Sequence, residues 1–132
     1  MPEFIIAAIL TGLSFGVLDG IINGNPYARR FMEVYQPIAR KKINVPAGVL
    51  IDIVYGFIIS GVFLLILPVL PSENGIVKGL VFGLGMWFFR VIMGAVSNWM
   101  MFKIPVNTIL YMLVTGFIEM IILGIINGLI IK

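Results

Sequence analysis

The sequence predicts an all-α fold, a polytopic membrane protein whose four transmembrane helices pack as a bundle. Three observations lead to this prediction. Of the 132 residues, 61% are hydrophobic and only 11% are charged. The mean hydropathy is +1.13, and four long apolar segments are separated by short polar or proline-containing stretches. A soluble domain of this length carries about a quarter charged residues, so the surface of this chain is expected to face lipid.

A helix that spans a bilayer needs roughly 20 mostly apolar residues, and it satisfies its own backbone hydrogen bonds, as hydrocarbon requires. Turn-forming residues separate the segments that meet this requirement, with prolines at Pro26, Pro68, Pro71 and Pro105. We predict a single membrane domain, residues 1–132, with spans at about residues 4–23, 47–70, 76–102 and 108–131, and a basic loop at 24–46.

The first span carries a regular stripe of small residues. Gly12, Gly16, Gly20 and Gly24 stand at every fourth position. Helices in lipid gain little from hydrophobicity and associate where small residues allow the backbones to approach closely. The stripe therefore predicts a tight helix–helix face, a glycine zipper.

The loop of residues 24–46 is both aromatic and basic. Tyr27, Phe31 and Tyr35 recur every four residues, so a short helix ending before Pro37 would present one aromatic face to the headgroup layer. We interpret the basic residues of the loop as lipid-interface residues, and a specific lipid or partner site is the alternative. These residues are Arg29, Arg30, Arg40, Lys41 and Lys42.

The distribution of lysine and arginine predicts the orientation in the membrane. Six basic residues lie on the side of this loop once Lys103 is included, whereas Lys78 and Lys132 lie on the other side. This bias places residues 24–46 in the cytoplasm of a cell-membrane protein and both termini outside. Any cytoplasmic membrane loop shows such a bias, so it does not indicate nucleic-acid binding.

The other three spans also carry small residues on one face, which predicts that every helix packs closely on another. They are Gly48, Gly56 and Ser60 in the second span, Gly79 and Gly83 in the third, and Gly116, Gly124 and Gly128 in the fourth.

Two internal similarities relate different spans. Residues 12–17, GLSFGV, resemble residues 79–84, GLVFGL, and this relates the first and third spans in the same direction. Separately, Thr11-Gly12 and Thr115-Gly116 each stand nine residues before the sequence GIING, which relates the first and fourth spans in opposite directions. Internal repeats are common in transporters. Chance matches within a restricted Gly, Ile and Leu alphabet are the alternative.

Four ionisable residues lie inside the spans, where each costs roughly 2.5–3.5 kcal/mol at the bilayer centre. Arg90 and Glu119 lie near the middle of the third and fourth spans, and Asp19 and Asp52 lie about one turn from the cytoplasmic ends. Asn98 shares that cytoplasmic level. Because each of the four shares a helix face with small residues, we predict a polar interior in which Arg90 pairs with Glu119.

Three interpretations of these intramembrane polar residues remain open. Arg90 and Glu119 form a structural ion pair, in which the loss of one partner leaves a buried charge at a cost of about 3–5 kcal/mol. In the second interpretation the polar residues line a pathway or pocket for an ion, a proton or a small polar solute. In the third they contact another membrane subunit.

The residues that the chain lacks exclude several kinds of chemistry. It has no cysteine and no histidine, which removes thiol nucleophiles, thiolate metal sites and the usual general base. The sequence contains no metal-ligand spacing, phosphate-binding glycine loop or nucleophile motif. We therefore expect no enzymatic activity, no metal and no cofactor.

A glycine-rich first helix runs into an aromatic-bearing stretch, residues 20–27 with Phe31 and Met32, and the third helix carries the run GLVFGLGMW at residues 79–87. In these features the chain resembles a family of small, functionally uncharacterised four-helix integral membrane proteins of bacteria and archaea. The resemblance covers most of the chain, and it implies the fold without an activity.

The sequence thus predicts a small integral membrane protein that binds or conducts an ion, a proton or a small solute through a polar helix interface. The alternative is a non-transporting structural or accessory subunit that packs through glycine-rich faces. The expected partners are membrane lipids and either further copies of the chain or another membrane subunit, because a lone four-helix bundle encloses only a narrow interior.

Overall fold

The computed structural model describes residues 2–38 and 44–131, and within these residues it contains helices and turns but no strand, so the all-α prediction is confirmed. Four helices are long and apolar enough to cross a membrane: Pro2–Asn23, Val45–Val69, Gly75–Met101 and Val106–Ile130. Their ends differ from the predicted ends by a residue or two. The chain is a multi-pass integral membrane protein.

The third span is not one regular α-helix, and a short helix follows the first span. The elements in chain order are α1 (Pro2–Asn23), α2 (Pro26–Phe31), a 3-10 helix (Glu33–Ile38), α3 (Val45–Ile66) with a 3-10 turn (Leu67–Val69), α4 (Gly75–Met86), a π-helical segment (Trp87–Ile92), α5 (Met93–Met101) and α6 (Val106–Ile130).

Asparagine side chains fix where three of the helices begin. The side-chain oxygens of Asn25, Asn44 and Asn74 accept hydrogen bonds from first-turn N–H groups of α2, α3 and α4, at 2.9, 3.1 and 2.9 Å respectively. Those N–H groups have no partner within the helix, and asparagine is a preferred residue for satisfying them.

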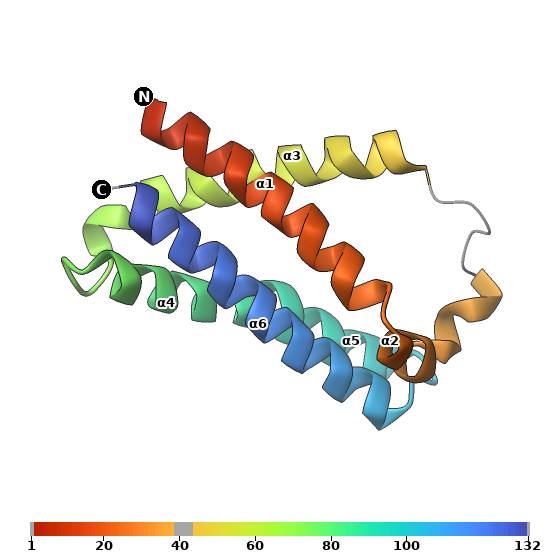
Figure 1. Cartoon of the computed structure of the whole chain (residues 1–132). Helices are drawn as coiled ribbons and strands as arrows, with labels where there is room; N and C mark the ends of the chain where they lie inside the picture. Colours follow the sequence, from red (N-terminus) through yellow and green to blue (C-terminus); the bar gives the residue numbers. More distant parts are fainter. Residues whose placement is uncertain (1, 39–43, 132) are drawn as a thin grey trace.

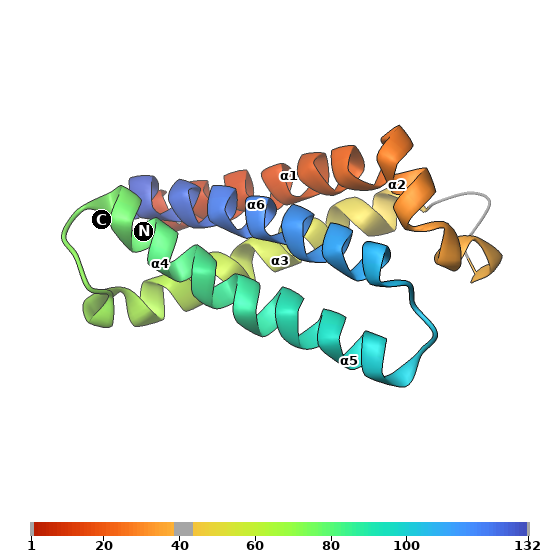
Figure 2. The same ribbon diagram turned by 90° about the horizontal axis from the view of Figure 1, so that it is seen from below.

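The bundle consists of two closely packed helix pairs. Helix α1 packs on α3, helix α4 packs on α6, and contacts between α1 and α6 join the two pairs. Figures 1 and 2 show that α1 begins and α6 ends at the same end of the bundle. We call this end, with the glycine contacts described next, the terminal half, and the opposite end, which carries α2 and α5, the loop half. In Figure 1, α3 crosses α1 and diverges from it towards the loop half.

Glycines bring the backbones together in both pairs, and they do so with the same pattern. A Cβ atom added to Gly12 would lie 2.8 Å from the carbonyl oxygen of Asp52, and one added to Gly79 would lie 2.5 Å from that of Gly124. In return, Gly56 faces the backbone of residues 8 and 12, as Gly128 faces that of residues 75 and 79. The packing therefore follows the parallel similarity between residues 12–17 and 79–84.

The predicted glycine stripe of the first span is only partly a packing face. Gly12 packs on the α3 backbone and Gly16 lies against the Asp52 side chain, whereas Gly20 is exposed and has no described atom within 4 Å of an added Cβ. Gly24 lies beyond the end of α1, against the Gly20 carbonyl. The contact within the chain ends before Gly20 and Gly24, because α3 has already diverged from α1 at their level. Gly83, by contrast, packs on the Met120 backbone of α6.

The connector after α1 docks on α6 instead of presenting a single aromatic face. Phe31 stacks on Tyr111 with 5.5 Å between ring centroids, and the Tyr35 hydroxyl reaches the Met112 sulfur at 4.0 Å. Tyr27 is 67% exposed and does not share this contact. Arg29 and Arg30 are exposed, as a lipid-interface position requires, and the predicted interface residues Arg40, Lys41 and Lys42 lie outside the described residues.

Candidate functional site

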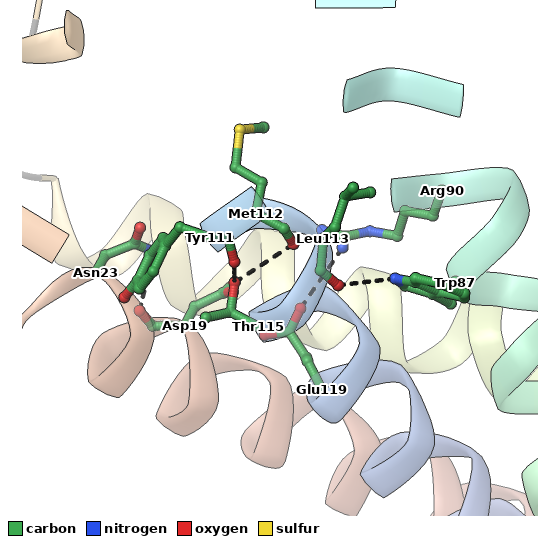
Figure 3. Close-up of polar contacts among 9 residues, drawn as sticks. All are labelled: Asp19, Asn23, Trp87, Arg90, Tyr111, Met112, Leu113, Thr115 and Glu119. Carbon is green, nitrogen blue, oxygen red and sulfur yellow. Dashed lines mark hydrogen bonds and ion pairs between the residues drawn. The ribbon is translucent and has the colours of Figure 1, made fainter. Parts of the chain in front are cut away.

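A polar cavity of about 390 Å³ lies in the loop half, between α1, α3, α6 and the segment from Arg90 to Asn98. Four of the five predicted intramembrane polar residues line it: Asp19, Arg90, Asn98 and Glu119. Figure 3 shows Asp19, Arg90 and Glu119 extending from three different helices towards one another. The interior of the loop half is therefore hollow and polar, in contrast to the glycine-packed terminal half.

The predicted pair of Arg90 and Glu119 is present in the structure. An Arg90 guanidinium nitrogen, Nη1, lies 3.5 Å from Glu119 Oε1 (Figure 3). Glu119 is only 2% exposed, whereas the Arg90 side chain is 32% exposed. The second carboxyl oxygen, Glu119 Oε2, is buried and has no hydrogen-bond partner among the described residues. Buried carboxyl oxygens are normally bonded, so this atom is the feature of the cavity that most needs an explanation.

Arg90 is held by aromatic rings as well as by Glu119. Its guanidinium carbon lies 4.7 Å from the centroid of Phe15 and 5.5 Å from that of Tyr55. These two rings, from α1 and α3, are nearly parallel and 5.2 Å apart. Aromatic ring faces attract cations, and the attraction strengthens where water is excluded. Phe15 and Tyr55 together form an aromatic platform that satisfies part of the Arg90 charge.

The helix that carries Arg90 is locally widened. The backbone N–H of Met93 bonds to the carbonyl of Phe88, five residues earlier, which defines the π-helical segment. The indole N–H of Trp87 donates to the Leu113 carbonyl on α6 at 2.9 Å (Figure 3) and ties this segment to the opposite wall. Such wide turns are rare and often occur at functional sites. Sequence periodicity did not predict this one.

Asp52 does not belong to the polar cavity, although the sequence grouped it with the other four residues. It lines a separate, mostly apolar groove between α1 and α3, together with Gly12, Gly16 and Gly48. The Asp52 carboxyl group lies against Gly16 of α1 in this groove. The predicted site is thus divided between two surfaces, with Asp52 in the groove and the other four residues in the polar cavity.

Hydrogen bonds join α6 to the α1–α2 turn beside the cavity. The Tyr111 hydroxyl donates to the Ile22 carbonyl and accepts from the Asn25 amide at 3.0 Å. One turn further along α6, the Thr115 hydroxyl donates to the Tyr111 carbonyl at 2.7 Å (Figure 3). These residues were not singled out as site residues from the sequence. Their spacing of four on α6, with Glu119 next in the series, was the available signal.

A second polar cluster, also missed, lies in the terminal half and contains no ionisable group. Ser60 donates to the side-chain oxygen of Asn127 at 2.6 Å, and the Asn127 amide donates to Thr11 at 3.0 Å and to the Leu123 carbonyl at 2.9 Å. Ser60, Asn127 and Thr11 are 0% exposed. This Thr11–Ser60–Asn127 cluster joins α1, α3 and α6. It is a satisfied structural network rather than a site.

The residues of the cavity do not form a metal centre. Among residues 2–38 and 44–131, no group of three or more histidine, cysteine, aspartate or glutamate side chains could hold a metal ion. The cavity instead offers two carboxyl groups, one guanidinium and uncharged polar groups. Such a set can bind, orient and release a small polar molecule.

Comparison of the chain with protein-family models, curated proteins and solved structures finds no match to any of them.

Proposed function

We propose that the protein binds a small polar solute or ion in the polar cavity and passes it across the membrane. The observation that carries this proposal is Glu119, which is almost fully buried yet keeps one carboxyl oxygen without a partner among the described residues, beside a cavity of about 390 Å³. Polar groups buried in a membrane are costly and face the bundle interior or a water-filled space. A ligand with a hydrogen-bond donor would satisfy this oxygen.

The position of the cavity supports passage rather than storage. It lies at mid-membrane on Glu119 and extends along Asp19 and Asn98 towards the end of the bundle that carries α2. The closely packed glycines and the Thr11–Ser60–Asn127 cluster occupy the other half. We propose that the site is accessible through the loop half and closed by the terminal half, as in one state of an alternating-access cycle. We propose that the open side is cytoplasmic, from the excess of basic residues there.

The alternative is an accessory subunit that docks through glycine-rich faces. Most glycines of the helix pairs, including Gly12, Gly56, Gly79 and Gly124, already contact backbone within the chain, and this weighs against such a role for them. The groove beside Gly48, where Gly20 is also open, is the surface left for a second copy of the chain. We therefore propose that the chain forms a homo-oligomer through this groove.

Transport by reconstituted vesicles tests the proposed function. We expect wild-type vesicles to take up a polar solute, and the doubly substituted chain Arg90→Leu with Glu119→Leu to fold, assemble and show no uptake. The matched control carries Glu73→Gln, which removes an exposed carboxyl group outside the cavity. Vesicles that show no flux of protons, alkali cations, small organic ions or zwitterions would refute passage and favour the accessory role.

A further inference from the structure

We infer that the polar cavity recognises a small organic monocation, a molecule of several non-hydrogen atoms that bears one N–H-donating positive group. This inference rests on the proposed function and names the class of solute. Its first support is charge. Asp19 and Glu119 line the cavity with one cation, Arg90. An added positive charge favours the ionised form of both carboxyl groups, and the two carboxylates, Arg90 and the ligand together would then carry no net charge.

The hydrogen-bonding capacity of the cavity points in the same direction. Glu119 Oε2 is a buried acceptor without a partner among the described residues. The Thr115 hydroxyl uses its proton on the backbone, so towards the cavity it offers only lone pairs. The main donor, the Arg90 guanidinium, is already engaged by Glu119 Oε1 and by the rings of Phe15 and Tyr55. The Asn98 amide and the Tyr55 hydroxyl are donors that also line the cavity, at partly exposed positions. The buried atom that still needs a donor is Glu119 Oε2, and ammonium and guanidinium groups supply one.

The size of the cavity argues for an organic ion over a bare one. Its volume of about 390 Å³ lies at the low end of the range in which proteins bind small molecules. The lack of a three-carboxylate cluster in the described part of the chain argues against a divalent metal ion. Half of the lining is aromatic or aliphatic, including Tyr55, Tyr111 and Val91, and this suits the apolar body of an alkylammonium ion.

The protein itself shows that this interior can hold an organic cation. The Arg90 guanidinium rests on two aromatic rings with a carboxylate at its edge. Tyr55 also lines the cavity, and it is 37% exposed. A ligand cation bound in the cavity would meet groups of the same kind, the Glu119 carboxyl group and the Tyr55 ring, which both line it.

Binding to the full chain in detergent tests the inference. The probe is propylammonium, compared with 1-propanol as the neutral molecule of similar size, propionate as the anion, β-alanine as the zwitterion and Na⁺ as the bare ion. We expect calorimetric titration to show binding of propylammonium at least about ten-fold tighter than of the other four, as expected for a charge-assisted hydrogen bond to a buried carboxylate.

Variants locate the site and separate recognition from folding. Glu119→Gln and Asp19→Asn each keep the side-chain shape, and each should weaken propylammonium binding about ten-fold or more. Glu73→Gln should leave it unchanged. Arg90→Gln removes the like charge, so it should strengthen propylammonium binding, whereas it would weaken the binding of a molecule held through a carboxylate.

Four outcomes count against the inference. It is overturned if β-alanine or propionate binds more tightly than propylammonium, if Na⁺ binds equally well, or if propylammonium binding survives in both carboxamide variants. It is also overturned if vesicles transport a solute and propylammonium does not bind, in which case the proposed function stands with another class of solute. If neither binding nor flux of any probe is found, the proposed function fails as well.

Discussion

The two halves of the bundle are built from the same four helices, yet they hold their polar groups in opposite ways. In the terminal half, glycines bring backbones into contact and the Thr11–Ser60–Asn127 cluster satisfies its own hydrogen bonds. In the loop half, the helices diverge around the polar cavity, and Glu119 keeps an oxygen without a hydrogen-bond partner among the described residues. The first arrangement holds the helices together, whereas the second leaves room for a ligand.

The two halves differ in whether the glycines of α1 and α3 contact the backbone of a neighbouring helix. Helices α1 and α3 carry several glycines, but only Gly12 and Gly56 face a neighbouring backbone, whereas Gly20, Gly48 and Gly61 face open space. Helices that meet at small residues in lipid gain mainly from close packing. The crossing point therefore acts as the fixed part of the bundle, and the cavity forms beyond it.

Removal of one partner of the ion pair should give the largest effect. We expect Arg90→Leu to destabilise the fold by about 3–5 kcal/mol, because it leaves the Glu119 charge buried without its partner. The double variant with Glu119→Leu should recover most of that loss. Unfolding in mixed detergent micelles measures both values. A double variant that loses as much as the sum of the two single variants would contradict the pairing.

A methyl group at the crossing point should come next. Gly56→Ala places a Cβ atom 2.6 Å from the Gly12 nitrogen, against backbone that cannot move aside. We expect a loss of about 1–3 kcal/mol in the free energy of unfolding. The matched change Gly61→Ala, on the same helix, meets no described atom within 4 Å and should cost nothing. Equal costs for the two changes would contradict the role of Gly56 as the close backbone contact at the crossing.

The satisfied cluster of the terminal half should matter for stability and not for binding. Asn127→Ala removes the bonds to Ser60, Thr11 and the Leu123 carbonyl, and hydrogen bonds between membrane helices contribute about 0.6–2 kcal/mol. We therefore expect destabilisation of that order with unchanged solute affinity. Thermal unfolding measures the stability, and calorimetric titration measures the solute affinity. A loss of affinity at unchanged stability would place the binding site in the terminal half.

The smallest effect is expected at the glycine that faces open space. Gly20→Ala should stabilise the protein by about 0.5–1 kcal/mol, because alanine is the better helix former and nothing described obstructs it. Gly12→Ala, two turns earlier, should destabilise. If both destabilise equally in thermal unfolding, the stripe is one continuous packing face and a partner covers Gly20.

Most of the fold and part of the site follow from the sequence. Span positions follow from hydropathy, and the pairing of Arg90 with Glu119 follows from depth and helix face, because a charge in lipid has few other partners. The place of Asp52 in the groove and the open space at Gly20 depend on the angle at which α1 crosses α3, which helix periodicity does not contain. The π-helical segment could not be predicted from helix periodicity either, because its wide turn lies within an ordinary run of apolar residues.

The Thr11–Ser60–Asn127 cluster could not be predicted from the sequence, because an uncharged polar residue in a membrane helix can find a hydrogen-bond partner in its own helix or in another one. Thr115, for instance, bonds to the carbonyls of its own helix, whereas Ser60 bonds to another helix. Only the packing distinguishes the two cases.

Thiol labelling tests the contrast between the two halves most directly, because the chain has no cysteine of its own. Asn98→Cys and Thr115→Cys place a thiol in the cavity, and Ser60→Cys places one in the closed terminal half. We predict that a charged, membrane-impermeant methanethiosulfonate reacts with the first two in vesicles, from one side only, and leaves Ser60→Cys unmodified. Labelling of Ser60→Cys at the same rate, or protection of both cavity positions from either side, would contradict the account.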